Sequence, residues 1–231
     1  MIRGIFPLDS WDFKSESILE DLPEQTALFE NSSEEVYQRG QLIFKEGKAP
    51  LGIFFIKEGK VKKFKMDKEG KVHIIYIARA GELIGYHALL ADEVYPDSAA
   101  AIEPSRVSFI SKEHFFAVLN DSKLLSQRVL KTLSHEFSVF ANNLTLIARR
   151  TVRERVATQL LLLREKYKHN FIPGMYVTVD FSREDLAGLV GTARENIIRV
   201  LRDFKKEGIL ETKGRKIIIT DVKKLLQVSN Y

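Results

Sequence analysis

The segment from Ser182 to Leu201, SREDLAGLVGTARENIIRVL, constrains the fold of this chain more than any other stretch. It predicts two short helices joined by a tight turn. Ser182 is a favourable N-cap for the first helix, and Gly191 can adopt the backbone angles that the turn requires. Thr192 is predicted to cap the second helix, with Glu195 completing a capping box three residues later. The segment therefore predicts a helix-turn-helix unit.

The second helix of this unit has one apolar and one charged face, and it is predicted to end at Gly208. The apolar face comprises Ile197, Val200, Leu201 and Phe204. The opposite face comprises Glu195, Arg199, Arg202 and Lys206, with Arg194 and Asn196 on its flanks. An arginine can bind guanine O6 and N7 together, and a glutamate can accept a hydrogen bond from cytosine N4. The helix is therefore interpreted as a recognition helix for the DNA major groove. The alternative is an amphipathic surface helix with solvated charges.

The charge of the chain is unevenly distributed. The whole sequence of 231 residues has a net charge of +5. Residues 149–231 contain 18 Lys and Arg against 10 Asp and Glu, a net charge of +8. Residues 1–148 contain 18 against 21, a net charge of −3. This asymmetry favours a polyanionic partner for the C-terminal third of the chain.

The composition also limits the class of protein. The length suits two domains, and 45% hydrophobic with 29% charged residues is typical of a folded globular protein. The sequence has no cysteine, which excludes disulfides, thiolate switches and cysteine-bound iron–sulfur clusters. No apolar run is long enough to cross a bilayer, and the N-terminus lacks the apolar core of a signal peptide. We therefore expect a cytoplasmic protein without a membrane partner.

Residues 1–120 are predicted to form a β domain. Short apolar runs alternate with glycines between Val36 and Ile110, a texture typical of a sandwich or jelly roll. The runs are Leu42–Phe44, Ile53–Ile56, Val72–Ile77 and Val107–Ile110. The segment Asp67–Gly70, DKEG, has the form of a hairpin loop.

Residues 121–150 are predicted to form a long helix with a heptad seam. Apolar residues recur at spacings of 3, 4, 3, 4 and 3. They are Leu130, Leu133, Phe137, Phe140, Leu144 and Ile147. A seam of this length usually pairs with another helix, so it predicts a homodimer. The alternative is a helix that packs only on the β domain.

Residues 151–231 are predicted to form a third part that contains the helix-turn-helix unit. A helix over residues 151–168, a turn at Asn170–Gly174 and a strand at Tyr176–Phe181 precede it. Strands at Ile209–Glu211 and Ile217–Thr220 follow it. The basic loop between these two strands carries Lys213, Arg215 and Lys216, and it is predicted to be a wing near the DNA phosphates.

This order of parts resembles the Crp/Fnr family of bacterial transcription regulators. The most specific match is Ser182–Leu201, with Gly208 and Lys213–Ile219 behind it. The resemblance implies an α+β fold: an N-terminal jelly roll of the cyclic-nucleotide-binding kind, a dimerisation helix and a C-terminal winged helix-turn-helix. It also implies a homodimer without enzymatic activity that binds palindromic double-stranded DNA and contacts RNA polymerase.

Positions that contact DNA in the family can be carried over onto this sequence. The spacing R-E-x-x-x-R of Arg194, Glu195 and Arg199 resembles the cyclic-AMP receptor branch, which implies a TGTGA-type half-site. Arg199 is expected on guanine, Glu195 on cytosine or adenine, and Ile198 against a thymine methyl. The expected DNA-binding set is Ser182, Thr192, Arg194, Glu195, Asn196, Arg199, Arg202, Lys213 and Arg215.

A second resemblance concerns the effector pocket of the family. Tyr86 stands where the family has a ribose-binding glutamate, and Asp97 stands where it has a phosphate-binding arginine. Phe140 and Ala141 stand where it has hydroxyls for the adenine. A carboxylate at Asp97 would repel a phosphate, so cyclic AMP is not expected. A more apolar pocket for a non-phosphorylated ligand, or an empty one, is expected instead. Its expected lining is Gly81, Glu82, Leu83, Gly85, Tyr86, Asp97, Ser98, Ala99 and Phe140.

The five histidines favour neither a metal site nor haem. His87 lies where a haem-sensing relative has a ligand, but the position of that relative's thiolate ligand is Gly85 here. A cupin-like metal-dependent enzyme with an appended DNA-binding module is an alternative. It would need two histidines one residue apart and a carboxylate, and nothing of that kind surrounds His73 or His87. A scaffold with a degenerate DNA-binding fold is a third possibility. No metal, haem or other cofactor is expected.

Overall fold

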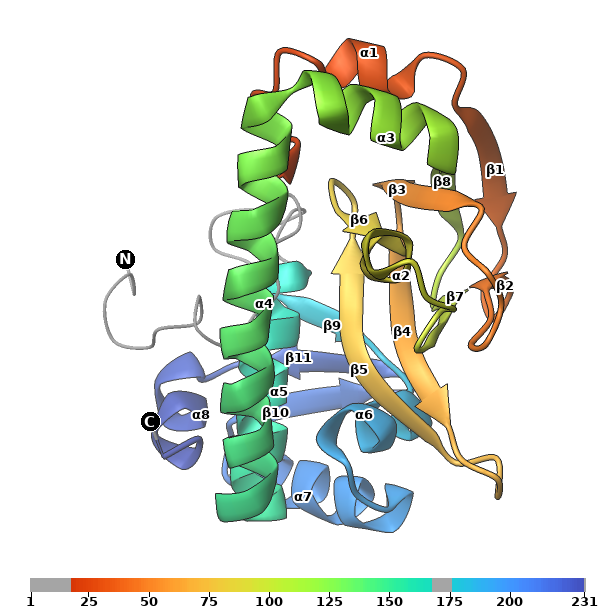
Figure 1. Ribbon diagram of the computed structural model, residues 1–231. Helices are drawn as coiled ribbons and strands as arrows, with labels where there is room; N and C mark the ends of the chain where they lie inside the picture. Colours follow the sequence, from red (N-terminus) through yellow and green to blue (C-terminus); the bar gives the residue numbers. More distant parts are fainter. Residues whose placement is uncertain (1–17, 168–175, 231) are drawn as a thin grey trace. The chain divides into compact units, whose positions relative to one another are not determined.

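The computed structural model describes residues 18–167 and 176–230 and divides them into two compact units (Figure 1). One unit contains residues 18–69 and 75–137, and the other contains residues 70–74, 138–167 and 176–230. The predicted turn at Asn170–Gly174 lies outside the described residues.

The first unit is a β roll with helices at its ends. Two four-stranded sheets have the orders β1-β8-β3-β6 and β2-β7-β4-β5. The strands are β1 (Ser33–Tyr37), β2 (Leu42–Phe44), β3 (Gly52–Glu58), β4 (Lys60–Met66), β5 (Val72–Arg79), β6 (Leu83–Ile84), β7 (Ser98–Ala101) and β8 (Ser105–Ser111). The helices are α1 (Gln25–Phe29), α2 (Tyr86–Ala91), α3 (Lys112–Asp121) and α4 (Lys123–Arg149), the last of which continues into the second unit.

Apolar side chains hold the roll together in two places. Between the sheets, the rings of Phe44 and Tyr95 stack with their centroids 4.1 Å apart, and Phe54 lies 5.7 Å from Phe44. On the other side of β3 and β8, Ile53 and Ile110 pair across the strands and belong to a buried cluster. This cluster packs α1, α2, α3 and the first half of α4 against the sheet. Its members from these helices include Leu28, Leu89, Phe115, Leu125 and Val129.

The four apolar runs lie within β2, β3, β5 and β8, so these strands were predicted correctly, and residues 67–70 form the turn between β4 and β5. The sequence did not predict β1, β4, β6, β7, α1 or α2. In β4 the reason is Lys63, whose side chain is buried at an inward position of the strand and interrupts the apolar pattern. A buried lysine requires a charged partner, which periodicity alone does not reveal.

Helix α4 has the predicted heptad seam, and most of the seam is exposed. Phe137 is 77% exposed and Leu144 is 70% exposed, and Leu130, Phe140 and Ile147 are exposed as well. Leu133 is the exception because it is partly buried against the core of the roll. The opposite face of the helix, with Val129, Glu136 and Val139, is buried. The seam thus does not pack only on the β domain, as the alternative interpretation required.

The second unit contains the predicted helices and hairpin. Its elements beyond α4 are α5 (Val152–Lys166), β9 (Thr178–Asp180), α6 (Arg183–Val190), α7 (Arg194–Lys206), β10 (Leu210–Lys213), β11 (Lys216–Ile219) and α8 (Val222–Val228). The three strands form one antiparallel sheet with the order β10-β11-β9. Phe181, Leu186, Ile197 and Phe204 are fully buried among the core residues of this unit. Helix α8 was not predicted.

The predicted capping box at the second helix of the helix-turn-helix is wrong. The N-cap of α7 is Ala193, which makes no side-chain hydrogen bond, and the Thr192 hydroxyl instead accepts a hydrogen bond from the Asn196 amide. Ser182 does cap α6 as predicted, because its hydroxyl accepts from the Asp185 N–H. A capping box occurs at α5, where the Thr151 N–H and hydroxyl each donate to Glu154 Oε2 over 2.7 Å.

We predict that Glu154→Gln makes the protein less stable above pH 4.5 and that this difference disappears toward pH 2. The hydrogen bonds from Thr151 and from Asn230 lower the pKa of the Glu154 carboxyl to about 2. A carboxyl whose pKa is lowered by folding stabilises the protein above its unfolded pKa and loses this contribution as the pH falls through its folded pKa. Chemical denaturation at several pH values measures the effect. A constant difference between the two proteins from pH 7 to pH 2 would contradict it.

Candidate nucleic-acid interface and effector pocket

Helix α7 presents a charged face while its apolar face is buried. Ile197, Val200, Leu201 and Phe204 are buried. The residues that the sequence assigned to DNA lie on the exposed side of the same helix, with Arg194, Glu195, Arg199 and Arg202 exposed and Asn196 partly exposed. Because the buried face anchors α7, the Cα positions of its outward side chains are fixed. These side chains can therefore enter a DNA groove from defined positions.

Three of these outward side chains are oriented by neighbours. The Asn196 amide donates to the Thr192 hydroxyl over 3.0 Å, and its Oδ1 accepts from the Arg199 guanidinium over 3.0 Å. Arg194 forms an ion pair of 2.5 Å with Glu184 of α6. Thr192, Asn196 and Arg199 thus form a chain of hydrogen bonds along one edge of the helix. This chain fixes the Arg199 guanidinium against Asn196, although surface contacts of this kind contribute little to stability.

The wing is held by an arginine that the sequence did not single out. Arg183, the first residue of α6, donates to the main-chain oxygens of Gly214 over 3.1 Å, Arg215 over 3.3 Å and Phe181 over 3.4 Å. Burial lowers the pKa of Arg183. Arg215 itself donates to Asp180 Oδ1 over 3.0 Å, whereas Lys213 is exposed on the other side of the turn. The wing turn is therefore tied to the start of the helix-turn-helix.

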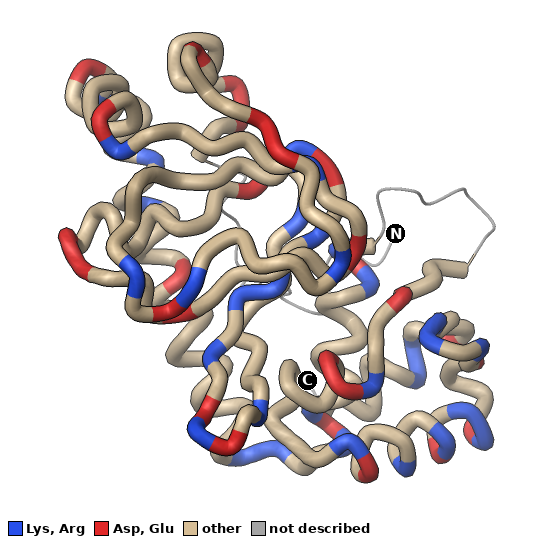
Figure 2. Tube along the Cα trace, turned by 90° about the vertical axis from the view of Figure 1, so that its right-hand side faces the viewer, with Lys and Arg blue, Asp and Glu red and all other residues tan. Residues whose placement is uncertain are grey.

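Charge alone does not mark the DNA-facing surface. Figure 2 shows acidic and basic segments interspersed over both units of the chain. The C-terminal third has an excess of basic residues, but some of them lie beside acidic ones. Arg194 pairs with Glu184, and Arg215 pairs with Asp180. The position of each side chain on α7 and on the wing distinguishes this surface from the rest.

The predicted effector cassette forms β6 and the start of α2. Gly81 and Gly85 both have left-handed backbone angles, φ +93° and +87°, which explains the two glycines. Glu82 is fully buried, accepts a hydrogen bond from Tyr76 and lies 3.5 Å from Arg79. Leu83 is buried in the helix-covered core. The glycines thus set the path of the chain, and the buried carboxylate of Glu82 has its own partners.

Asp97 has a buried cation as its partner. Its carboxylate lies 3.2 Å from the Lys63 ammonium, and both side chains are buried. Ser98 accepts a hydrogen bond from the Glu46 N–H, and Ala99 pairs with Lys63 in the sheet. The surroundings of the cassette are thus more ionic than the sequence suggested. The sequence analysis did not identify Lys63 as the partner of Asp97. The signal that could have identified it is a lysine at an inward position of one strand and an aspartate beside the neighbouring strand.

Tyr86 and His87 both bind one buried carboxylate on helix α4. The Tyr86 hydroxyl donates to Glu136 Oε1 over 2.6 Å, and His87 Nε2 lies 2.5 Å from Glu136 Oε2. Tyr86 is 1% exposed and Glu136 is 4% exposed. Burial raises the pKa of Tyr86. Burial alone would also raise the pKa of Glu136, but the contacts with His87, Tyr86 and Lys63 lower it. The sequence did not single out Glu136.

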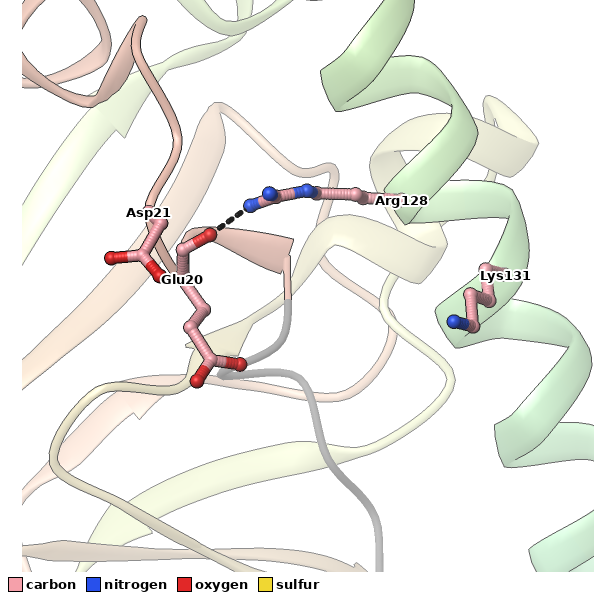
Figure 3. Close-up of a pocket in the computed structure, with 4 residues that line it drawn as sticks. All are labelled: Glu20, Asp21, Arg128 and Lys131. Carbon is pink, nitrogen blue, oxygen red and sulfur yellow. Dashed lines mark hydrogen bonds between the residues drawn. The ribbon is translucent and has the colours of Figure 1, made fainter.

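A measurable pocket lies elsewhere in the roll unit, with a volume of about 280 Å³ (Figure 3). Glu20, Asp21, Arg128 and Lys131 line it. Arg128 donates to the main-chain oxygens of Glu20 and Ile18. Two acidic and two basic residues around an open hollow give it no net charge. None of its lining residues belongs to the predicted effector set.

The predicted pocket residue Phe140 lies in the part of α4 that belongs to the second unit, and its side chain is half exposed. The other predicted pocket residues belong to the roll. Within residues 18–167 and 176–230, no three His, Cys, Asp or Glu side chains gather as a metal site would require. In the same residues, no helix has the length and apolar character needed to cross a bilayer.

Two stretches of the chain match known domain families. Residues 34–122 match the cyclic nucleotide-binding domain, and residues 154–228 match the Crp-like helix-turn-helix domain. The chain is 27% identical over 192 residues to the fumarate and nitrate reduction regulatory protein of Vibrio cholerae, covering 83% of this chain and 76% of that protein. It is 26% identical over 189 residues to the CRP-like cAMP-activated global transcriptional regulator of Mycobacterium tuberculosis, covering 82% and 84%.

Solved structures show the same fold. FixK2 from Bradyrhizobium japonicum has a TM-score of 0.73 at 20% identity, and the match covers 85% of this chain and 96% of that chain. A transcriptional regulator of the Crp/Fnr family from Eubacterium rectale has a TM-score of 0.71 at 21% identity, covering 93% and 98%.

A cyclic-nucleotide-binding-type roll, followed by a Crp-like helix-turn-helix, defines a DNA-binding transcription regulator. The chain belongs to the Crp/Fnr family of such regulators. These relatives are named as regulators, and the comparisons do not support the cupin-like enzyme that the sequence left as an alternative.

We predict that Glu136→Gln lowers the free energy of unfolding at pH 7 by about 1.5–3 kcal/mol, the range for a hydrogen bond to a charged group. The pKa of Glu136 is lowered from 4.5, so its contribution is present above pH 4.5 and is lost as the pH falls through the folded pKa. The difference between wild type and variant should therefore narrow in acid. Chemical denaturation measures it, with the exposed Glu93→Gln as a control. Equal effects of the two variants at pH 7 would contradict the assignment.

Proposed function

We propose that this regulator acts as a homodimer that reads a palindromic, TGTGA-like DNA site with its two copies of α7. The observation that carries the proposal is that one chain has both an exposed apolar seam on α4 and a recognition helix whose apolar face is buried. The seam supplies a surface for another copy of the chain. The recognition helix supplies a charged face for a major groove. In this proposal residues 1–120 form the sensor, residues 121–150 the dimerisation helix and residues 151–231 the DNA-binding domain.

Base recognition is assigned to the exposed side of α7. Arg199 would bind guanine through O6 and N7, Glu195 would accept from cytosine or adenine, and Ile198 would contact a thymine methyl. Ile198 is exposed beside these charges, which supports a contact with an apolar group on a base. The chain of hydrogen bonds from Thr192 through Asn196 holds Arg199 ready for this contact.

Contacts to phosphates are assigned to the ends of the same surface. Lys213 is exposed on the wing, and Ser182 caps the first helix of the unit. Arg194, Arg202 and Arg215 complete the basic set, although Arg194 and Arg215 already have acidic partners in the protein. Each of these two would exchange a carboxylate for a phosphate, so their net contribution to affinity should be smaller than that of Lys213.

The dimer would be formed by the α4 seam. Leu130, Phe137, Phe140, Leu144 and Ile147 leave a continuous apolar surface that a second copy would bury. Leu133 would contribute less, because it already packs on the roll.

The effector of this regulator, if it has one, differs from cyclic AMP. The mycobacterial relative is described as cAMP-activated. Here Asp97 forms an ion pair with Lys63, and Tyr86 donates to Glu136, so neither is available for a nucleotide in the way that a ribose-binding glutamate or a phosphate-binding arginine would be. We further propose that the protein acts in the cytoplasm together with RNA polymerase, since a bacterial regulator meets its DNA there.

We predict that Arg199→Ala costs about 1–3 kcal/mol of binding free energy for each half-site of the selected palindrome and relaxes the preference at one base pair in each. Lys213→Ala should weaken binding to all sequences alike and reduce the slope of log K against log salt by about 0.9 for each copy, or about 1.8 for the dimer. Selection from a random duplex library gives the site, and fluorescence anisotropy gives the affinities. Equal losses for Arg199→Ala on selected and scrambled duplexes would contradict its assignment to a base.

We predict that Phe137→Glu shifts the protein from dimer to monomer, because each copy would place a charge in the apolar seam. Sedimentation velocity measures the oligomeric state, and circular dichroism shows whether the monomer stays folded. Val36→Glu is a matched control, since Val36 is an exposed apolar residue of β1, outside the seam. A Phe137→Glu protein that remains dimeric would rule out this seam as the interface.

A further inference from the structure

Arg155 of α5 binds three main-chain oxygens from two segments of the chain. Its Nε donates to the oxygen of Val190, its Nη2 to that of Gly191 and its Nη1 to that of Arg150, each over 3.1 Å. The side chain is partly buried. Each of its three side-chain nitrogens thus donates to a main-chain carbonyl. Arg155 is therefore engaged within the protein, unlike an arginine whose guanidinium is exposed for binding a DNA phosphate.

Two of these carbonyls belong to the turn of the helix-turn-helix. Val190 is the last residue of α6, and Gly191 is the left-handed residue of the turn, with φ +70°. The final carbonyls of a helix lack partners within the helix and carry partial negative charge. A planar guanidinium can bind both at once, whereas the single ammonium of a lysine cannot reproduce this fork. Arg155 therefore fixes the point from which α7 starts.

The third carbonyl belongs to the end of α4. Arg150 follows directly after Arg149, the last residue of α4, and its N–H still bonds to the oxygen of Leu146. Leu144 and Ile147, at the C-terminal end of the seam, lie on the same final turns. One guanidinium thus connects the end of the seam helix to the turn before the recognition helix.

Neighbouring Arg153 fixes the other end of α7. It forms an ion pair of 2.6 Å with Glu207, and its guanidinium lies 4.6 Å from the centre of the Phe204 ring. Glu207 is the C-cap of α7. Arg153 thus holds the recognition helix to α5, whereas Arg155 binds the residue that follows the end of α4.

We propose that Arg155 is a positioning residue that sets the orientation of α7 relative to the C-terminal end of the seam, and thereby the spacing between half-sites that the dimer accepts. The inference rests on the proposed function, since spacing has a meaning only for a dimer on a palindrome. Two recognition helices reach successive major grooves only if each is held at a fixed geometry relative to the dimer axis. Without Arg155, each α7 can still read its half-site, but the distance between the two is less strictly defined.

The test uses the full-length protein and four duplexes: the selected palindrome, the same half-sites with one base pair added or removed between them, and a single half-site. Wild type should prefer the selected spacing strongly. Arg155→Lys should lose about tenfold on the selected palindrome, because the two recognition helices are no longer preorganised at one spacing, and should show a correspondingly weaker preference between spacings. Its affinity for the single half-site and its salt slope should stay at the wild-type values.

Arg164→Lys is the matched control, because Arg164 lies on the same helix and pairs with its neighbour Glu165 over 2.5 Å. This variant should keep the wild-type preference for spacing. Arg155→Lys retains the charge and most of the side chain, so it tests the fork without the loss of packing that Arg155→Ala would add.

Three results would overturn the inference. One is an Arg155→Lys protein that prefers the selected spacing as strongly as wild type. Another is an equal loss on all four duplexes, which would make Arg155 a general support of the fold. A third is a salt slope on the palindrome reduced by about 1.8, about 0.9 for each copy, which would make Arg155 a phosphate contact. A wild-type protein that is indifferent to spacing would instead overturn the proposed function, and the inference with it.

Discussion

The constraint on which the regulator depends is that α4 is apolar on two faces, of which the chain covers one. Val129 and Glu136 are buried on the inner face, whereas Phe137 and Leu144 remain largely exposed on the outer face. Apolar surface in water is unfavourable by about 25 cal/mol for each Å² that a partner could cover. In the proposed dimer a second copy would cover this surface, and the same helix ends where the DNA-binding elements begin. Association and DNA reading would thereby be connected through one element.

The buried charged side chains of the roll have partners within the roll. Lys63 neutralises Asp97, and Glu136 receives hydrogen bonds from the α2 side of the roll. Buried charges are tolerated only with such partners. A ligand that entered here would therefore have to replace the ion pair of Asp97 and the hydrogen bond of Glu136.

The sequence predicted most of the fold because the signals were periodic or local. The heptads of α4, the apolar face of α7 and the Ser182 cap depend on spacing that can be read along the chain. What it missed depends on contacts over distance. Thr192 was assigned to a cap because it precedes a helix, but Asn196 offers it a different partner. The sequence analysis did not single out Lys63 or Arg155, because their partners, a distant aspartate and main-chain oxygens, leave no mark on the pattern of neighbouring residues.

The exposed seam also has a consequence for how such a regulator responds to its own abundance. If the copies join only through a modest apolar surface, the amount of dimer at low levels rises with the square of the amount of chain. A twofold change in synthesis or degradation would then alter the occupancy of a weak target by up to about fourfold, as mass action requires. Gene dosage and proteolysis would thus act as inputs to the regulator, even for a roll that binds no small molecule.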